Sequence, residues 1–140
     1  MNEATISRTV RITNNRPLPR TGIFAACARD ELRRLSRCGD LIEVDAGVVV
    51  QDPQRLQWVY VLFDGSLGVT SGDMAYVVMG GGAIGLRSAL LGDPPLVSIT
   101  ALANTRLYVA RATEFAALAR SLKGLAFGIA RHLALETREP

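Results

Sequence analysis

The stretch from Gly80 to Thr100 constrains the fold more than any other part of the chain. It begins with three consecutive glycines, and glycine allows backbone conformations that other residues avoid. The run Leu86–Leu91 fits a short helix, which must end at Gly92 because two prolines follow closely. An apolar, β-tolerant pattern resumes at Val97. The stretch therefore predicts a strand, a glycine turn, a short helix and another strand.

Gly85 directly precedes this expected helix. The free N–H groups and the dipole of a helix N-terminus can hold an anion. Taken alone, however, the pattern is explained more simply by a tight turn between strands with one turn of helix.

Short β-type runs separated by turns dominate the middle of the chain. Asp64-Gly65 is a strong hairpin signal, after which the next run is expected to pair back onto the preceding one. A second turn, containing Pro53, is expected from Gln51 to Gln57. Such spacing predicts a sandwich or barrel. The expected strands are Ile42–Val44, Val48–Val50, Trp58–Phe63, Ser66–Thr70, Met74–Met79, Ser98–Ala103 and Arg106–Ala110.

Helices are expected on both sides of the β region. Residues 23–38 place apolar side chains at spacings of three and four, and Gly39 is a plausible stop. After the strands, Thr113 is expected to cap a helix over residues 114–120, and Ser121 to cap a second one reaching about Glu136. One apolar stripe on these last helices contains Phe115, Leu118, Leu122, Leu125, Ile129 and Leu133.

The segment from Ile84 to Ile99 resembles, without gaps, the phosphate-binding insert of the cyclic-nucleotide-binding domain family. This is the β-roll shared by catabolite-activator-like regulators and cyclic-nucleotide-gated proteins. Ala46-Gly47 and Val59–Val69 resemble further signatures of that family, so the resemblance covers about residues 20 to 135. The matching positions of the insert are Gly85, Ser88, Leu90, Gly92, Pro94, Ser98 and Ile99.

The resemblance implies a mainly β fold, a double-stranded β-roll (jelly-roll, cupin-like) with a helical lead-in and C-terminal helices. We expect a flexible basic arm over residues 1–19 and a domain over residues 20–140. Within that domain the β-roll covers about 41–110 and the C-terminal helices about 113–136. We expect no DNA-binding helix-turn-helix in this sequence.

Two ligand-binding positions of the family are altered. Its ribose-binding Glu falls on Leu86, and its phosphate-binding Arg falls on Pro95. A buried charge without its partner costs ~3–5 kcal/mol, and a lost hydrogen bond to a buried hydroxyl costs ~1–3 kcal/mol. The low ends of these ranges together predict about a thousandfold weaker binding of a cyclic nucleotide.

Eight residues are the candidates for lining a ligand pocket. The backbone N–H groups of Ser88 and Ala89, with the hydroxyls of Ser88 and Ser98, could hold an anion weakly. Arg87 could instead replace the missing cation, although its place on the helix favours a surface role. The candidates are Gly85, Leu86, Arg87, Ser88, Ala89, Pro95, Leu96 and Ser98.

Charge and reactive residues are distributed unevenly. The formal net charge is +3, with eight arginines against four acidic residues in residues 1–40 and a net of −3 over residues 41–110. Arginine-rich ends could contact nucleic acid, but without interleaved aromatic residues they are more simply a solvated surface. Cys27, Cys38 and His132, the only thiols and imidazole, do not form a metal site by spacing.

No catalytic motif, metal site or cofactor is therefore expected, and we do not expect an enzyme. No signal segment or long apolar run is present, so we expect a cytoplasmic protein without a membrane partner.

Three hypotheses of function remain. The first is a regulatory or adaptor module that binds cAMP or cGMP weakly or not at all and acts through protein contacts. A homodimer through the helix stripe Leu122, Leu125, Ile129 and Leu133 would suit it. The second is a small-molecule sensor with an altered ligand. The third is nucleic-acid binding by the arginine-rich ends. Gly124 and Gly128 could also allow another helix to approach closely, or merely lower helix propensity.

Overall fold

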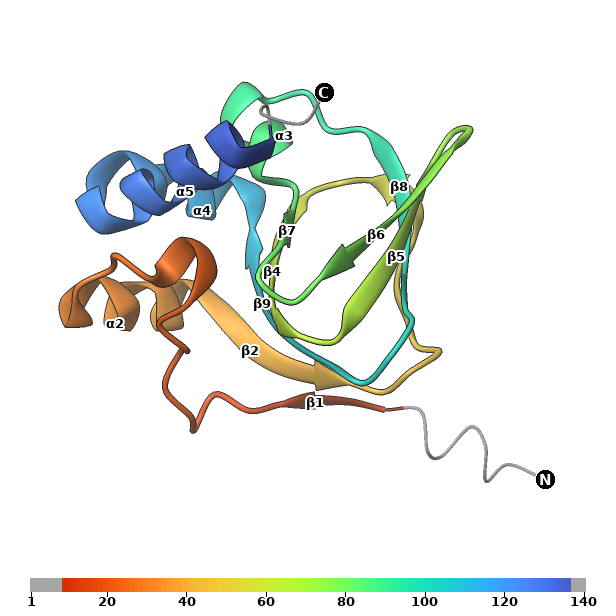
Figure 1. Ribbon diagram of the computed structural model, residues 1–140, viewed down its shortest axis with the longest axis horizontal. Helices are drawn as coiled ribbons and strands as arrows, with labels where there is room; N and C mark the ends of the chain where they lie inside the picture. Colours follow the sequence, from red (N-terminus) through yellow and green to blue (C-terminus); the bar gives the residue numbers. More distant parts are fainter. Residues whose placement is uncertain (1–8, 137–140) are drawn as a thin grey trace.

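The computed structural model describes residues 9–136, which form two antiparallel sheets with helices on one side (Figure 1). The strands are β1 (Val10–Ile12), β2 (Gly39–Val44), β3 (Val49–Arg55), β4 (Trp58–Asp64), β5 (Ser66–Ser71), β6 (Met74–Met79), β7 (Ala83–Ile84), β8 (Leu96–Ala101) and β9 (Thr105–Arg111). The helices are the 3-10 helix η1 (Gly22–Phe24), α2 (Arg29–Cys38), α3 (Leu86–Leu91), α4 (Ala112–Ser121) and α5 (Lys123–Glu136). The expected β-roll with a helical lead-in and C-terminal helices is confirmed.

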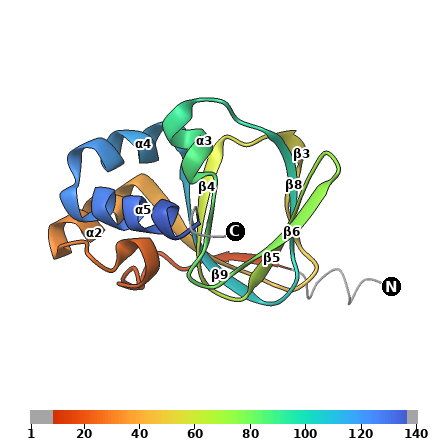
Figure 2. The ribbon, with the colours of Figure 1, turned by 45° about the horizontal axis from the view of Figure 1, so that its top comes forward.

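The two sheets enclose one hydrophobic core. The five-stranded sheet has the order β1-β2-β9-β4-β7, and the four-stranded sheet has the order β3-β8-β5-β6. Leu62 and Leu107 of the first sheet pack with Leu67 and Ile99 of the second. In Figure 2 the sheets form the two walls of the roll. Apolar residues on the inner faces thus hold the roll together.

A second core lies between the five-stranded sheet and the helices. Phe24, Leu35 and Phe115 pack there around Tyr108, whose ring meets Phe24 edge to face with centroids 5.4 Å apart. The Tyr108 hydroxyl donates a hydrogen bond to the Leu35 carbonyl at 2.6 Å. Strand β4 is buried on both faces, with Val59 and Val61 in this core and Tyr60 and Leu62 in the other, which explains its continuous apolar sequence.

Two glycines let α5 lie directly against the N-terminal segment. A Cβ on Gly128 would stand 2.0 Å from the Ile23 carbonyl oxygen, and one on Gly124 would stand 2.3 Å from that of Ala26. The Gly124–Gly128 spacing thus serves a close approach, here to η1 and the turn after it rather than to another helix.

The expected caps of the last two helices were wrong. Helix α4 begins at Ala112, so Thr113 lies inside it. The Ser121 hydroxyl donates back to carbonyls of α4, at 3.4 Å from Ala117 and 3.3 Å from Leu118. The N-terminus of α5 is capped instead by the Glu31 carboxylate of α2.

The single helix expected over residues 23–38 was also wrong. The segment forms η1, a turn and then α2, because Ala28 has an extended backbone and the Cys27 carbonyl accepts a hydrogen bond from Arg20 Nε at 2.9 Å. Gly39 does end α2, but with an extended backbone that starts β2 at once. A Cβ there would stand 2.4 Å from the Val109 carbonyl oxygen.

The hairpin expected at Asp64-Gly65 was wrong as well. The turn exists, but β4 pairs with β9 and β7, whereas β5 pairs with β6 and β8. The turn therefore carries the chain from one sheet to the other. Gly65 has a φ of 94°, and a Cβ on it would stand 2.4 Å from Thr105 Oγ1, so glycine is required here.

The turn expected over residues 51–57 was wrong, because β3 continues to Arg55. Pro53 is tolerated because β3 is an edge strand and its register with β8 shifts between Gln51 and Gln54. The buried Gln51 amide holds this irregular stretch: it donates to the Val97 carbonyl at 3.2 Å and accepts from the Tyr60 hydroxyl at 3.0 Å.

The flexible arm expected over residues 1–19 is corrected for its described part; residues 1–8 lie outside the described residues. Strand β1 pairs with β2, with Arg11 opposite Glu43. Arg11 also forms an ion pair with Asp45 at 3.1 Å, and Leu18 is buried in the helix-side core. None of the helices described over residues 9–136 combines the length and apolarity needed to cross a bilayer.

Candidate functional site

The glycine-to-helix segment folds as its sequence predicts. Helix α3 spans Leu86–Leu91 between Gly85, with φ 95°, and Gly92, with φ 77°. Both glycines have left-handed backbones that other residues rarely adopt. A Cβ on Gly85 would also stand 2.6 Å from the Trp58 carbonyl oxygen, so the start of α3 lies close against β4.

A pocket of about 800 Å³ opens beside this helix. Its walls come from β6, β7, α3 and the last turn of α5, whose closeness to α3 and the roll is visible in Figure 2. Tyr76 and Val78 lie on the face of β6 that continues the buried face of β5. Most of the lining side chains are apolar: Leu56, Met74, Tyr76, Val77, Val78, Met79, Ala83, Ile84, Leu86, Leu91, Pro95, Val97 and Leu133.

Arg87, His132 and Glu136 meet at the mouth of this pocket. Glu136 places Oε1 at 3.5 Å from Arg87 Nη2 and Oε2 at 3.1 Å from His132 Nε2. Burial and the nearby Glu136 carboxylate both raise the pKa of Tyr76. The Glu136 carboxylate therefore joins α3 to the end of α5 within reach of the β6 wall.

The structure separates the eight predicted pocket residues into two groups. Five line the pocket: Gly85, Leu86, Arg87, Ser88 and Pro95. Ala89, Leu96 and Ser98 are not among its lining residues.

Three of the four polar groups expected to hold an anion form hydrogen bonds within the protein. The Ala89 N–H and the Ser88 hydroxyl both donate to the Gly85 carbonyl, at 2.9 and 3.2 Å. The Ser98 hydroxyl is hydrogen bonded to that of Thr70. These three donors therefore already have partners within the protein.

The two altered ligand positions contribute no polar side chain to the pocket. Leu86 is buried and packs into the helix-side core. Pro95 is exposed, and its carbonyl accepts a hydrogen bond from the Leu56 N–H at 2.9 Å. The cation that could replace the family's phosphate-binding Arg is Arg87, which forms an ion pair with Glu136.

Sequence reasoning missed Tyr76, His132 and Glu136 as pocket residues. The spacing of His132 and Glu136, four residues apart on a helix, signals a side-chain pair. Nothing in the sequence shows that this pair meets α3, because the contact depends on how α5 packs.

The structure places most of the helix stripe predicted for a dimer inside its own chain. Leu122, Leu125 and Ile129 are buried in the core of their own chain, and Leu133 lines the pocket. Leu122, Leu125 and Ile129 therefore present little surface to a second copy, whereas Leu133 is half-buried.

The cysteines are poorly suited to nucleophilic chemistry. Burial, and then the Glu31 carboxylate, raise the pKa of Cys27 to about 12. Burial and Glu114 raise the pKa of Cys38. A protonated thiol is a weak nucleophile and metal ligand. Across residues 9–136 no three His, Cys, Asp or Glu side chains gather into a group that could hold a metal.

Comparison with solved structures identifies the class of fold: this is the β-roll of the cyclic-nucleotide-binding domains. No protein-family model matches the sequence, and no curated protein does. The predicted resemblance is thus confirmed at the level of structure.

Three similar structures illustrate it. The sensor domain of the transcriptional regulator DNR from Pseudomonas aeruginosa has a TM-score of 0.65 and 15% identity, covering 81% of this chain and 86% of that one. The catabolite activator protein of Thermus thermophilus has a TM-score of 0.63 and 20% identity, covering 83% and 58%. The regulatory subunit of a cAMP-independent protein kinase A from Trypanosoma brucei has a TM-score of 0.63 and 15% identity, covering 84% and 42%.

The chain therefore spans 58% and 42% of the lengths of the last two proteins. At these identities the likeness establishes the fold.

Proposed function

We propose that this chain is a regulatory sensor module whose pocket takes a largely apolar ligand in place of a cyclic nucleotide. The observation that carries the proposal is the pocket of about 800 Å³, lined mainly by apolar side chains, beside an intact glycine-to-helix segment. Sites for small molecules have this size and this apolar character with a few convergent polar groups.

Electrostatics argue against a cyclic nucleotide as that ligand. Its phosphate needs a cation with free donors and its ribose hydroxyl needs an acceptor. Leu86 and Pro95 supply neither, and Arg87 is occupied by Glu136. The module is accordingly proposed to bind cAMP and cGMP weakly or not at all.

Isothermal titration calorimetry on the full chain tests this proposal. We expect no binding of cAMP or cGMP at micromolar concentrations, whereas an apolar probe, decan-1-ol, binds. Micromolar binding of either nucleotide would contradict the first part. Failure of decan-1-ol to bind would contradict the second.

A second candidate function, self-association, is favoured by strand β6. The Gly80 N–H bonds the Gly65 carbonyl at 3.2 Å, and strand alternation from that pair directs the backbone groups of Tyr76 and Val78 toward β5. Those of Ala75 and Val77 therefore point to the outer edge. Within residues 9–136 no strand pairs with this edge.

The β6 edge lacks the features that usually prevent edge pairing. Edge strand β3 carries Asp52, Pro53 and a register shift, and edge strand β1 carries Arg11. All six residues of β6 are uncharged, and Met74, Val77 and Met79 are 68%, 55% and 62% exposed. Such an edge is a site for pairing with another chain.

The occupant proposed for this edge is the β6 strand of a second copy. Antiparallel pairing of two identical edges about a two-fold axis gives the free backbone N–H and C=O groups of both strands a partner. No residue from Met74 to Met79 is charged, so the two strands do not repel each other. The predicted homodimer is thus proposed at β6 instead of α5.

Sedimentation equilibrium tests the dimer. Val77→Lys, which puts a positive charge from each copy on the shared edge, should give a monomer, while Val49→Lys at a similarly exposed position of β3 should not change the assembly. A monomeric parent protein, or a Val77→Lys dimer as tight as the parent, would contradict the proposal. A heteromeric partner strand would be indicated only if the parent is monomeric.

A further inference from the structure

The contacts at the mouth of the pocket point to the chemical class of the ligand, an inference that rests on the proposed function. We infer that the pocket takes a carboxylate with an apolar tail. Its carboxylate replaces that of Glu136 between Arg87 and His132, and its tail lies against the apolar walls.

The first support is the geometry of the group already present. The two oxygens of the Glu136 carboxylate are divided between Arg87 Nη2, at 3.5 Å, and His132 Nε2, at 3.1 Å. One residue comes from α3 and the other from α5, so the two nitrogens are held by separate elements. A ligand carboxylate that offers one oxygen to each nitrogen reproduces these contacts.

The second support is that replacing Glu136 by a ligand carboxylate costs little stability. The side chains of Arg87 and Glu136 are 57% and 48% exposed, and ion pairs this exposed contribute little to stability. A ligand carboxylate keeps the same partners and adds burial of its tail, which is favourable. The tail would contact side chains from three elements: Tyr76 and Val78 of β6, Leu91 of α3 and Leu133 of α5.

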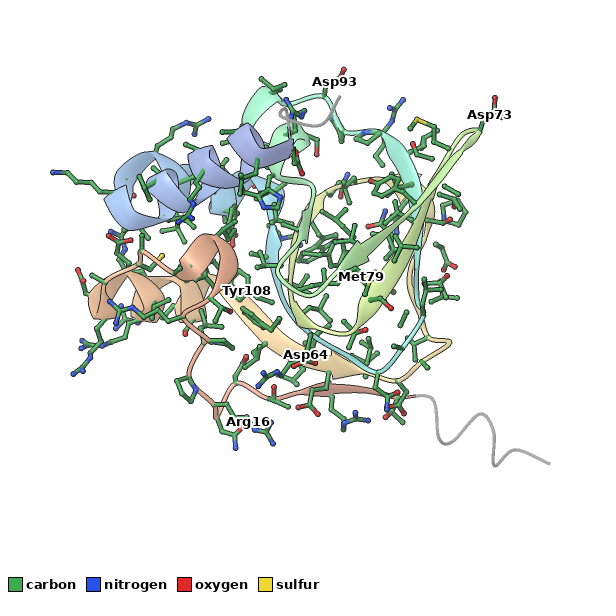
Figure 3. All side chains as sticks on the ribbon, viewed as in Figure 1. Arg16, Asp64, Asp73, Met79, Asp93 and Tyr108 are labelled. Atoms are coloured by element: carbon green, nitrogen blue, oxygen red, sulfur yellow. The ribbon has the colours of Figure 1, made fainter. Side chains whose placement is uncertain are left out.

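The third support is the sign of the charge left behind. Once Glu136 moves away, Arg87 and His132 face the entering group, and the Arg87 guanidinium would attract an anion and repel a cation. Asp93 is the other acidic residue that lines the pocket, and it forms no ion pair within residues 9–136. Figure 3 places it on the loop after α3.

The exchange would also carry a signal. Glu136 is the last residue of α5, and its contact with Arg87 joins that helix to α3. A ligand that takes over Arg87 and His132 would release the end of α5. Ligand binding would thus be coupled to the position of a helix end at the surface.

Calorimetry with a matched series of probes tests the inference on the full chain. Decanoate, decan-1-ol and decyltrimethylammonium share a ten-carbon tail and differ in head-group charge. We expect decanoate to bind at least tenfold more tightly than decan-1-ol, and decyltrimethylammonium to bind most weakly.

Three variants locate the effect. Arg87→Met should weaken decanoate at least tenfold and leave decan-1-ol unchanged. Glu136→Gln, which removes the competing anion, should strengthen decanoate three- to tenfold. Asp93 carries the same charge in the same pocket but is not bonded to Arg87 or His132. Asp93→Asn should therefore change the affinity for decanoate less than twofold.

The outcomes separate this inference from the proposed function. If decan-1-ol binds but decanoate binds no more tightly, or if Arg87→Met weakens both equally, the carboxylate assignment is overturned and the apolar pocket stands. If Asp93→Asn strengthens decanoate as much as Glu136→Gln does, competition by Glu136 is overturned. If no probe binds, both proposals fail.

Discussion

Gly128 is the residue that sets how closely α5 approaches the N-terminal segment. Replacing it with alanine would place a Cβ 2.0 Å from the Ile23 carbonyl oxygen, which belongs to backbone and cannot rotate away. We expect Gly128→Ala to lower the free energy of unfolding by about 1–3 kcal/mol, a typical result of overpacking. Urea denaturation followed by circular dichroism measures this change.

The control for Gly128→Ala is the reverse change on the exposed face of the same helix. Ala126→Gly should cost about 1 kcal/mol from helix propensity alone. Helix propensity alone would make the protein more stable with alanine at position 128. Only the close contact with the Ile23 carbonyl oxygen makes alanine destabilising there. A Gly128→Ala protein as stable as the parent would contradict the packing described here.

At the scale of elements, α5 depends on a cap from a distant part of the chain. The Glu31 carboxylate of α2 accepts the N–H groups of Gly124 and Leu125 at 3.2 and 3.1 Å. We expect Glu31→Ala to lower the free energy of unfolding by about 0.5–2 kcal/mol, as for loss of an N-cap. Asp30→Ala, an exposed acid in the same turn of α2, should cost less; equal losses would show a general charge effect instead.

The same elements show how far the sequence predicts this fold. The bounds of β6 and α3 follow from local signals, a β-branched apolar run and two flanking glycines. The pairing of β5 does not, because Asp64-Gly65 determines a turn but not which sheet the next strand joins. Glu31 could not be assigned as a cap because 93 residues separate it from Gly124.

The candidate site divides in the same way. The loss of ligand chemistry at Leu86 and Pro95 is readable in the sequence, since it concerns residue types at fixed positions in a local motif. The meeting of Arg87 with Glu136 is not, because it requires α5 to pack against η1 and to end beside α3.

At the scale of the whole molecule, α5 runs from the helix layer to the pocket. Its first half packs on η1 in the helix layer (Figure 1). Its last turn lines the pocket. The opposite end of the five-stranded sheet is completed by β1, which is attached to β2. The pocket and the β1 attachment are therefore separate, and one can be perturbed without changing the other.

The attachment of β1 should depend on pH through Asp45. Its carboxylate accepts a hydrogen bond from the Thr9 N–H and pairs with Arg11; these contacts, the Thr9 bond first, hold the pKa of Asp45 below its usual value. A lowered pKa in the folded state means that this stabilisation is complete above the usual aspartate pKa. It is lost as pH falls through the lower folded value.

We therefore expect the amide protons of β1 to exchange faster, relative to those of β4, as pH is lowered from 7 to below about 4, the ordinary aspartate value. Asp45→Asn should exchange quickly at β1 at every pH, because the charge is absent throughout, and should flatten the dependence. Asp52→Asn in β3 removes an exposed acid elsewhere and should leave the profile unchanged. A pH-dependent β1 in Asp45→Asn would assign the effect to another carboxylate, with Glu43, which also pairs with Arg11, as the remaining acid at this contact.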